Sequence, residues 1–254
     1  MIEDRSLSVV VPAFNEERRL PALLALFEHK AVAVLKNAGF ELRELIVVND
    51  GSTDGTAELL AAHEGVIPGL RVIQFEKNRG KGAAVAAGML AALHPFALVT
   101  DVDVATPLEE AGKLLAALEP GFDIAIGSRA LPASTIAVRQ PLHRELMGKT
   151  FNRMLRLMTG LPYRDTQCGF KLFRRATTLR LFELQRIEGF AFDAELLVSA
   201  RRLSITVVEV PVRWSDDSST TVGLIRAPVA MMRDLLRIAW HARGPRTTRR
   251  AAKG

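Results

Sequence analysis

Cysteine is almost absent from this chain, because Cys168 is the single one among its 254 residues. A fold stapled by disulfide bonds is therefore excluded. Cys168 has no paired histidine, so the sequence does not indicate a thiol nucleophile. The first residues, MIEDRSLSVVV, carry acidic residues before the apolar run, whereas a signal peptide carries basic ones. The sequence thus predicts a protein of a reducing compartment without a signal peptide.

Long uninterrupted apolar runs are also lacking. The best candidate for a membrane span, 83–99, is uncharged but rich in alanine and broken by His94 and Pro95. It is shorter than the roughly 20 apolar residues that a helix needs to cross a bilayer. Because 48% of the residues are hydrophobic, disorder is excluded as well. We therefore expect a folded protein that is soluble or bound peripherally to a membrane.

Acidic residues are missing from 241–254, which carries five basic residues and adds to a net charge of +6. A basic end of this kind is typical of a segment that binds nucleic acid or an anionic membrane, and equally of a solvated tail. The sequence leaves this choice open.

The first half of the chain alternates short β-branched runs with longer segments whose apolar residues recur at helical spacing. Continuous apolar strands alternating with helices predict an α/β fold, with a mostly parallel sheet covered by helices on both faces. The predicted strands are 7–14, 42–50, 70–76, 96–101 and 122–128.

Polar segments follow each of the five predicted strands. Ligands of open α/β sheets bind at the carboxyl ends of the strands, so these segments should meet at one edge. Carboxylates, glycines and a lysine gathered there predict a functional site. The segments are 12–16, 49–54, 78–82, 101–103 and 127–129.

Asp101 and Asp103 stand two positions apart where the fourth predicted strand ends, and strand alternation would aim both carboxylates the same way. Paired carboxylates without a nearby His or Cys suit Mg²⁺ or Mn²⁺, which keeps open positions for a substrate's phosphates. The alternative is a helix cap formed by Asp103 or by Thr106 before Pro107. We favour the metal, because Thr106 explains the cap and leaves the two aspartates without a structural task.

Two further residues of this edge have weaker patterns. Asp50 could accept a hydrogen bond from the N–H of a base, while Ser52 or Thr53 would cap the next helix. Lys81 lies between two glycines at the start of a helix, so it could face an anion, although such glycines often serve simple turns. Val85 stands where a dinucleotide-binding loop has its third glycine.

The second half departs from this alternation. Residues 141–159 predict an amphipathic helix. Its basic stripe suits acidic lipid headgroups or a phosphate, and equally a solvated face. The basic stripe is Lys149, Arg153 and Arg156, and the apolar stripe is Met147, Phe151, Met154, Leu155 and Met158.

Taken in order, these segments resemble the family-2 glycosyltransferases of GT-A fold over about residues 6–238. The matching motifs are VPAFNE, VNDGSTDGT, NRGKGAA, DVD, GSR, DTQCGFK and FAFDAEL. DTQCGFKLF and FDAELL are similar to the polyprenyl- or dolichyl-phosphate sugar transferases. The glucosyl branch, which uses UDP-glucose, is nearer than the mannosyl branch, which uses GDP-mannose, because Ala105 stands where mannosyl enzymes often carry Gln.

The resemblance implies which residues bind the donor. Asp101 and Asp103 would hold Mg²⁺ or Mn²⁺ and the ribose-diphosphate region, and Lys81 would lie near the nucleoside pocket. The donor set is Pro12, Phe14, Glu16, Asp50, Lys81, Asp101, Val102 and Asp103.

The resemblance also implies an acceptor side. Arg129 and Arg144 would bind the acceptor's phosphate, and Asp165 or Asp193 would be the base if the acceptor were a hydroxyl. The residues around the sugar and the acceptor would be Gln167, Asp193 and Glu195. The set expected to be catalytic is Asp103, Arg129, Arg144 and Asp165.

The implied activity is inverting, metal-dependent transfer of a sugar, favoured as glucose from UDP-glucose, to polyprenyl or dolichyl phosphate. We also expect the protein to bind an anionic membrane surface and not nucleic acid. The expected location is cytoplasmic, peripheral to the inner face of the membrane. We expect one GT-A domain at 1–240, with a nucleotide-sugar half at 6–129 and an acceptor half at 130–240. The basic tail at 241–254 is expected to be disordered.

The sequence departs from the family pattern in two places. The loop 214–222 has a Thr where relatives commonly have a Lys that meets the diphosphate. Many relatives also have C-terminal membrane helices, and this sequence shows no such segment. One alternative to this activity is a family-2 transferase that acts on a hydroxyl acceptor or uses GDP-mannose. The other is an inactive module that binds a nucleotide sugar or recruits the protein to a membrane. A sugar-phosphate nucleotidylyltransferase is disfavoured, because 12–16 is not a Gly-rich loop.

Overall fold

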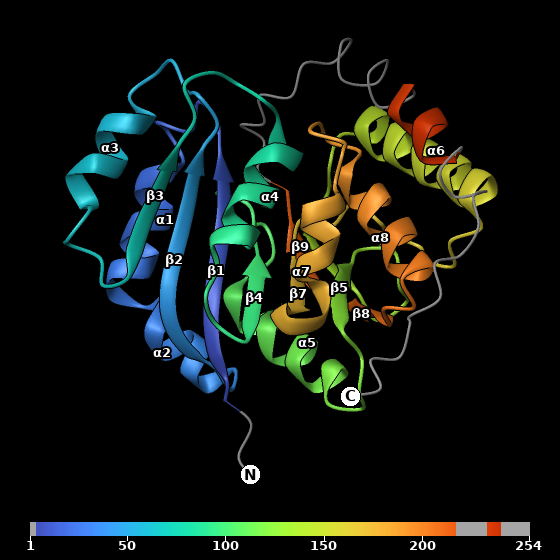
Figure 1. Cartoon of the computed structure of the whole chain (residues 1–254), viewed down its shortest axis with the longest axis horizontal. Coiled ribbons are helices and arrows are strands. Elements are labelled where there is room, and N and C mark those ends of the chain that lie inside the picture. The colour runs from blue at the N-terminus through green and yellow to red at the C-terminus, as the bar shows by residue number, and fades with distance from the viewer. Residues whose placement is uncertain (1–3, 217–232, 240–254) are drawn as a thin grey trace, which may run out of the picture.

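A seven-stranded sheet forms the centre of the computed structural model, which describes residues 4–216 and 233–239 (Figure 1). The strand order is β3-β2-β1-β4-β7-β5-β8, and β7 alone among them runs antiparallel to its two neighbours. The predicted, mostly parallel α/β sheet is therefore confirmed. Its strands are β1 (Ser6–Ala13), β2 (Glu41–Asn49), β3 (Leu70–Gln74), β4 (Phe96–Val99), β5 (Ile124–Ser128), β7 (Lys171–Arg174) and β8 (Val207–Pro211).

Helices cover both faces of the sheet because the strands are apolar on both sides. Val9 and Val11 of β1 belong to one buried cluster, and Val10 between them belongs to the other. Helices of the first cluster are α1 (Leu20–His29), α2 (Ala31–Asn37), α3 (Thr56–His63) and α5 (Ala111–Leu118), which follows the short 3-10 helix η1 (Leu108–Glu110). Helices of the second are α4 (Lys81–Ala91), α7 (Arg175–Leu184) and α8 (Phe192–Arg202).

The acceptor half predicted at 130–240 adds a long helix and a small second sheet. Helix α6 (Leu142–Thr159) matches the prediction to within one residue, and β6 (Thr135–Val138) pairs in parallel with β9 (Arg213–Ser215). Leu155 is fully buried, and Phe151, Met154 and Met158 pack beside it. Met147 is 43% exposed, so the apolar stripe begins one turn later than predicted. No helix among the described residues is long and apolar enough to cross a membrane.

The strands of the two predicted halves alternate within the sheet, since β7 lies between β4 and β5 and β8 lies beyond β5. The halves therefore contribute side chains to both buried clusters. The domain limits at 1–240 stay a prediction, and the tail at 241–254 lies outside the described residues, as do 217–222 of the loop in which Thr replaces Lys.

Gly88 tests the contact between α4 and the sheet. A Cβ at Gly88 would lie 2.4 Å from Cγ1 of Val10 and 3.2 Å from Cγ2 of Val48. Gly88→Ala should therefore lower the free energy of unfolding by about 1–3 kcal/mol, although alanine favours helix. Gly148→Ala in α6 is the control, because a Cβ there meets nothing within 4 Å. Urea denaturation that showed Gly88→Ala to be as stable as Gly148→Ala would contradict this packing.

Candidate active site

The carboxyl ends of β1, β2, β4 and β5 face one edge of the sheet, where the predicted polar segments meet (Figure 1). Hydrogen bonds tie the first two segments together. The Asn15 backbone N–H donates to Ser52 Oγ at 2.9 Å, and the Thr53 N–H donates to Asn15 Oδ1 at 2.8 Å. Asn15 has a left-handed φ of 54°, which asparagine tolerates better than most residues. Pro12 lies at the end of β1 and Phe14 is 40% exposed at the edge.

Asp50 is buried and holds the loop that leads into α4. Its carboxylate accepts hydrogen bonds from the N–H groups of Arg79 at 2.7 Å and Gly80 at 2.8 Å, and from Asn78 Nδ2 at 3.0 Å. Burial raises the pKa of Asp50, and the two backbone donors oppose that rise. The predicted cap by Ser52 or Thr53 is wrong: α3 begins after Gly55, and Asp54 accepts from the Thr56 N–H and hydroxyl.

Lys81 and Asp101 form an ion pair at this edge, with Nζ 2.6 Å from Oδ1. Burial opposes the charged form of Lys81, but the carboxylates of Asp101 and Asp193 outweigh it and raise its pKa. The other oxygen of Asp101 lies against Gly169, where a Cβ would come within 2.0 Å of Oδ2. Gly169 therefore leaves the space that the Asp101 carboxylate fills.

Asp101 and Asp103 belong to a turn, because β4 ends at Val99. The prediction that strand alternation aims their carboxylates is therefore wrong. The Val104 N–H donates to the Asp101 carbonyl at 3.1 Å, and Val104 takes a left-handed φ of 46°, which is rare for a β-branched residue. Asp103 Oδ1 accepts from the Ala105 N–H at 3.1 Å, and neither Asp103 nor Thr106 caps a helix.

Arg19 stands between two carboxylates of the donor set. Its Nε is 2.6 Å from Glu16 Oε2 and its Nη1 is 3.8 Å from Asp103 Oδ2. Burial raises the pKa of both Glu16 and Asp103, and the Asp101 carboxylate adds to each rise. Within the described part of the chain, no three His, Cys, Asp or Glu side chains are grouped so that they could hold a metal without further ligands.

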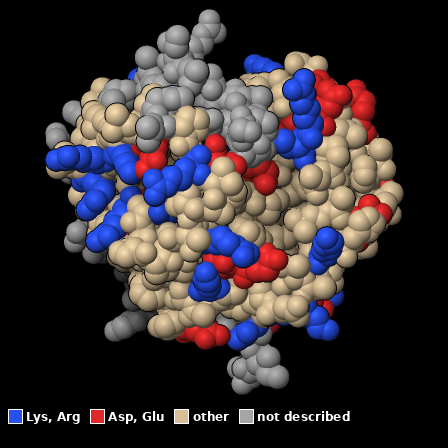
Figure 2. Space-filling model, turned by 180° about the vertical axis from the view of Figure 1, so that it is seen from behind, with Lys and Arg blue, Asp and Glu red and all other residues tan. Residues whose placement is uncertain are grey.

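A basic cavity of about 680 Å³ lies between α6 and the end of β5. Six of its lining residues are cationic and two, Glu145 and Asp165, are acidic. Lys and Arg side chains gather on the side of the molecule that α6 occupies (Figure 2). We call this cavity the basic pocket. Its cationic lining consists of Arg129, Arg139, Lys149, Arg153, Arg156 and Arg164.

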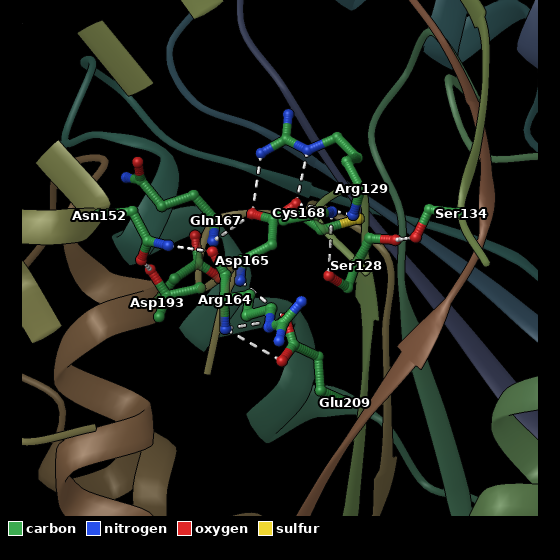
Figure 3. A network of polar contacts seen from close by, with 12 residues as sticks. Ser128, Arg129, Ser134, Asn152, Arg164, Asp165, Gln167, Cys168, Asp193 and Glu209 are labelled. Carbon is green, nitrogen blue, oxygen red and sulfur yellow. Dashed lines mark hydrogen bonds and ion pairs between the residues drawn. The ribbon is translucent and has the colours of Figure 1, made fainter. Parts of the chain in front are cut away.

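Arg129 is fixed in the basic pocket by Asp165 (Figure 3). Its Nε and Nη2 donate to the two carboxylate oxygens at 2.7 and 3.0 Å, and its backbone N–H donates at 3.0 Å. Its guanidinium also lies 5.4 Å from the Trp214 ring centroid. Burial disfavours both charges, but each charge stabilises the other, so the pKa of Arg129 is raised and that of Asp165 is lowered.

The loop that follows Asp165 joins the basic pocket to Asp101. Gln167 lines the pocket, Cys168 is buried, and Gly169 meets the Asp101 carboxylate. Burial and then the Asp165 carboxylate raise the pKa of the Cys168 thiol. A segment of five residues thus connects the two groups of charges.

The remaining predicted residues lie in different places. Asp193 is 5% exposed and forms an ion pair with Lys171, in which the lysine Nζ lies 2.6 Å from Asp193 Oδ1. Burial raises the pKa of Asp193, and the positive charge of Lys171 opposes this rise. Glu195 accepts from the N–H groups of Arg186 and Ile187 and does not line the basic pocket.

Val102 and Arg144 need separate mention. The Val102 side chain belongs to the core cluster, so only its backbone lies at the edge. Arg144 lies within α6, and its side chain is outside the described residues. Sequence reasoning missed Arg139 and Arg164 in the pocket and Lys171 beside Asp193. Lys171 stood in the quoted motif DTQCGFK, and Arg164 immediately precedes it.

The mostly parallel sheet with helices on both faces has the GT-A fold, as its similarity to solved structures shows. Glucosyl-3-phosphoglycerate synthase from Mycobacterium tuberculosis, in complex with Mn²⁺, UDP and glucosyl-3-phosphoglycerate, aligns with 95% of this chain and 81% of its own. The TM-score is 0.66 at 22% identity. Its complex with Mn²⁺, UDP-glucose and phosphoglyceric acid aligns with 93% and 80%, with a TM-score of 0.65 at 21% identity. The predicted fold is confirmed.

The chain belongs to glycosyl transferase family 2, whose family model matches residues 8–182. Dolichyl-phosphate beta-glucosyltransferase from Drosophila melanogaster is 40% identical over 91% of this chain and 74% of its own length. The proteins of the same name from Dictyostelium discoideum and Homo sapiens are 33% and 36% identical, over 93% and 91% of this chain and 75% and 74% of theirs. The family predicted from the motifs is confirmed.

The Arg129–Asp165 pair makes stability depend on pH. The pKa of Asp165 is lowered in the folded protein, so the ion pair stabilises the fold fully when the pH is above the ordinary pKa of 3.8. This stabilisation is lost as the pH falls through the lowered pKa that Asp165 has in the folded protein. Asp165→Asn should cost about 2–3 kcal/mol at neutral pH, because a half-buried guanidinium loses its charged partner. Urea denaturation should show the gap between variant and wild type shrinking below about pH 4. A constant gap would contradict the lowered pKa.

Proposed function

We propose that this protein is an inverting glycosyltransferase that moves glucose from UDP-glucose to a polyprenyl or dolichyl phosphate. The supporting observation is the basic pocket, which Gly169 and its loop connect to the carboxylates of the donor side. The similarity to dolichyl-phosphate beta-glucosyltransferases over nine tenths of the chain supports the same substrates.

Asp101 and Asp103 fit a divalent metal such as Mg²⁺ or Mn²⁺. Both side chains are partly exposed, 35% and 18%, and carboxylate oxygens are ligands that these hard ions prefer. Magnesium is commonly held by one or two carboxylates together with a substrate's phosphates, so a third protein ligand is not required. When bound, the ion would neutralise the charge that develops on the leaving diphosphate.

The acceptor chemistry explains why cations rather than a base surround the basic pocket. A phosphate monoester has a second pKa of roughly 6, so its oxygen is already a nucleophile at neutral pH. The protein then has to position it, and the planar guanidinium of Arg129 offers directed hydrogen bonds for this task. Both carboxylate oxygens of Asp165 accept hydrogen bonds from Arg129, so Asp165 fits the role of a positioning residue better than that of a base. Attack from the pocket on the anomeric carbon would invert it.

A transfer assay tests the proposed function directly. Purified protein is incubated with Mn²⁺ or Mg²⁺ and radiolabelled UDP-glucose or GDP-mannose, with polyprenyl phosphate, a polyprenol or phosphoglyceric acid as acceptor. We expect label in the lipid fraction only with UDP-glucose and polyprenyl phosphate. Transfer to the other acceptors, or from GDP-mannose, would replace the proposal by one of those activities. No transfer at all would favour an inactive binding module.

Asp103 should be important for turnover and not for folding. Asp103→Asn keeps the acceptor for the Ala105 N–H but removes the charge, so we expect turnover to fall about 100-fold or more. The free energy of unfolding should change by less than about 0.5 kcal/mol. Glu109→Gln removes an exposed charge nearby and should leave turnover unchanged. Metal-dependent activity that survives in Asp103→Asn would exclude the metal assignment.

Arg129 should serve the acceptor and not the donor. Arg129→Lys keeps the charge but loses the planar fork, so the KM for polyprenyl phosphate should rise about tenfold while that for UDP-glucose stays unchanged. Arg144→Lys should act in the same direction. Arg180→Lys, in an exposed pair on α7, is the control. Equal losses for donor and acceptor would refute this division.

The acceptor lipid requires the protein to meet a membrane, and we propose that it does so peripherally, at the cytoplasmic face. Helix α6 exposes Leu146 and Leu157, by 67% and 78%, beside the cations of the basic pocket. Each cation near an anionic surface contributes about 1 kcal/mol, and salt screens this attraction.

Co-sedimentation with liposomes measures this contact. We expect binding to anionic vesicles at low salt, weak binding to neutral ones, and loss of binding at high salt or after truncation at His241. Leu146→Ser combined with Leu157→Ser should weaken binding without changing the salt dependence. Salt-insensitive binding, or none to anionic vesicles, would contradict peripheral docking.

A further inference from the structure

The loop that carries Asp165 is held by a carboxylate from a different part of the chain. Glu209 lies in the middle of β8, opposite Ile126 of β5. Its Oε1 accepts the backbone N–H of Asp165 at 2.7 Å, and its two oxygens accept that of Arg164 at 3.1 and 3.0 Å (Figure 3). One side chain therefore fixes two consecutive peptide groups.

The same loop is fixed from the opposite side by α6. Asn152 Nδ2 donates to the Arg164 carbonyl, and Asn152 Oδ1 accepts from the Thr166 hydroxyl at 3.2 Å. Glu209 and Asn152 thus hold the backbone at 164–166 between the sheet and the helix that lines the basic pocket. Neither residue belongs to the set that the sequence predicted.

The two residues whose N–H groups Glu209 accepts have different tasks. The Asp165 carboxylate receives three hydrogen bonds from Arg129, and the Arg164 side chain lines the basic pocket. A shift of the Asp165 backbone would move its carboxylate, and the guanidinium bound to it would move as well. A carboxylate suits this position because both of its oxygens accept, whereas a glutamine would turn an NH₂ donor toward one of the backbone N–H groups.

We infer that Glu209 is a positioning residue of the basic pocket: it fixes the Asp165 backbone so that Asp165 presents Arg129 to the acceptor's phosphate. This inference rests on the proposed function of the pocket. Glu209 does not line the pocket itself, so it acts through Asp165 and Arg129 and has no contact with the acceptor.

The test compares Glu209→Gln with a matched variant at the other end of the same strand pair. Asp123 precedes β5, and its carboxylate accepts the backbone N–H and the hydroxyl of Thr206, each at 2.8 Å, just before β8. Asp123→Asn therefore weakens a similar carboxylate-to-backbone contact far from the basic pocket. Steady-state kinetics with each substrate varied in turn, and thermal unfolding, are measured for both variants.

We expect Glu209→Gln to raise the KM for polyprenyl phosphate about tenfold with little change in the KM for UDP-glucose. Asp123→Asn should leave both KM values unchanged, even where the two variants lose similar thermal stability. Glu209 would have a structural role only if Glu209→Gln raised both KM values equally. The same would follow if Asp123→Asn raised the acceptor KM as much as Glu209→Gln does. If Glu209→Gln does not accumulate, Glu209→Asp keeps the charge with a shorter side chain and should change the same KM.

The double variant separates this inference from the proposed function. If Glu209 acts through Arg129, Glu209→Gln should add little to the acceptor KM of Arg129→Lys, because residues of one network are not additive. If the two substitutions instead raised the acceptor KM of the double variant by the product of their separate effects, the inference would be overturned. An acceptor KM raised by Arg129→Lys but not by Glu209→Gln would also overturn it, with the proposed function intact. A wild-type acceptor KM in Arg129→Lys would refute the acceptor role of the pocket itself.

Discussion

The ion pair between Arg129 and Asp165 is the contact on which the geometry of the basic pocket depends. The two residues are 36 positions apart in the chain, one after β5 and the other in the loop before β7. The Asp165 carboxylate is almost fully removed from water and would be costly there without the guanidinium, which itself is 29% exposed toward the pocket. Together they leave a guanidinium in a fixed orientation in a cavity whose other cations come mainly from α6.

The other charges at this edge of the sheet are paired as well. Lys81 pairs with Asp101, Lys171 pairs with Asp193, and Arg19 reaches Glu16 and Asp103. Gly169 then places the Asp101 carboxylate next to the loop that begins at Asp165. The loop of five residues from Asp165 to Gly169 thus separates the charges around Asp101 from those of the basic pocket.

Local patterns were sufficient to predict the five strands of the first half, because apolar β-branched runs can be recognised over a few residues. They also predicted which loops meet, since parallel strands end at one edge. They could not predict β7, a short strand within the motif DTQCGFKLF whose antiparallel place is fixed by distant partners. They gave the wrong geometry for Asp101 and Asp103, because β4 ends early and Val104 adopts a left-handed conformation that its side chain disfavours. Glu209 was invisible for a similar reason: its partners are 44 and 45 residues away.

In the proposed reaction, a sugar passes in one displacement from UDP-glucose to a phosphate held in the basic pocket. The anomeric configuration of the product, measured by NMR after reaction with UDP-α-glucose and polyprenyl phosphate, reports whether this displacement is single. A single displacement predicts a β-linked glucosyl phosphate. An α-linked product, or glucose released only to water, would contradict a single displacement by the acceptor's phosphate.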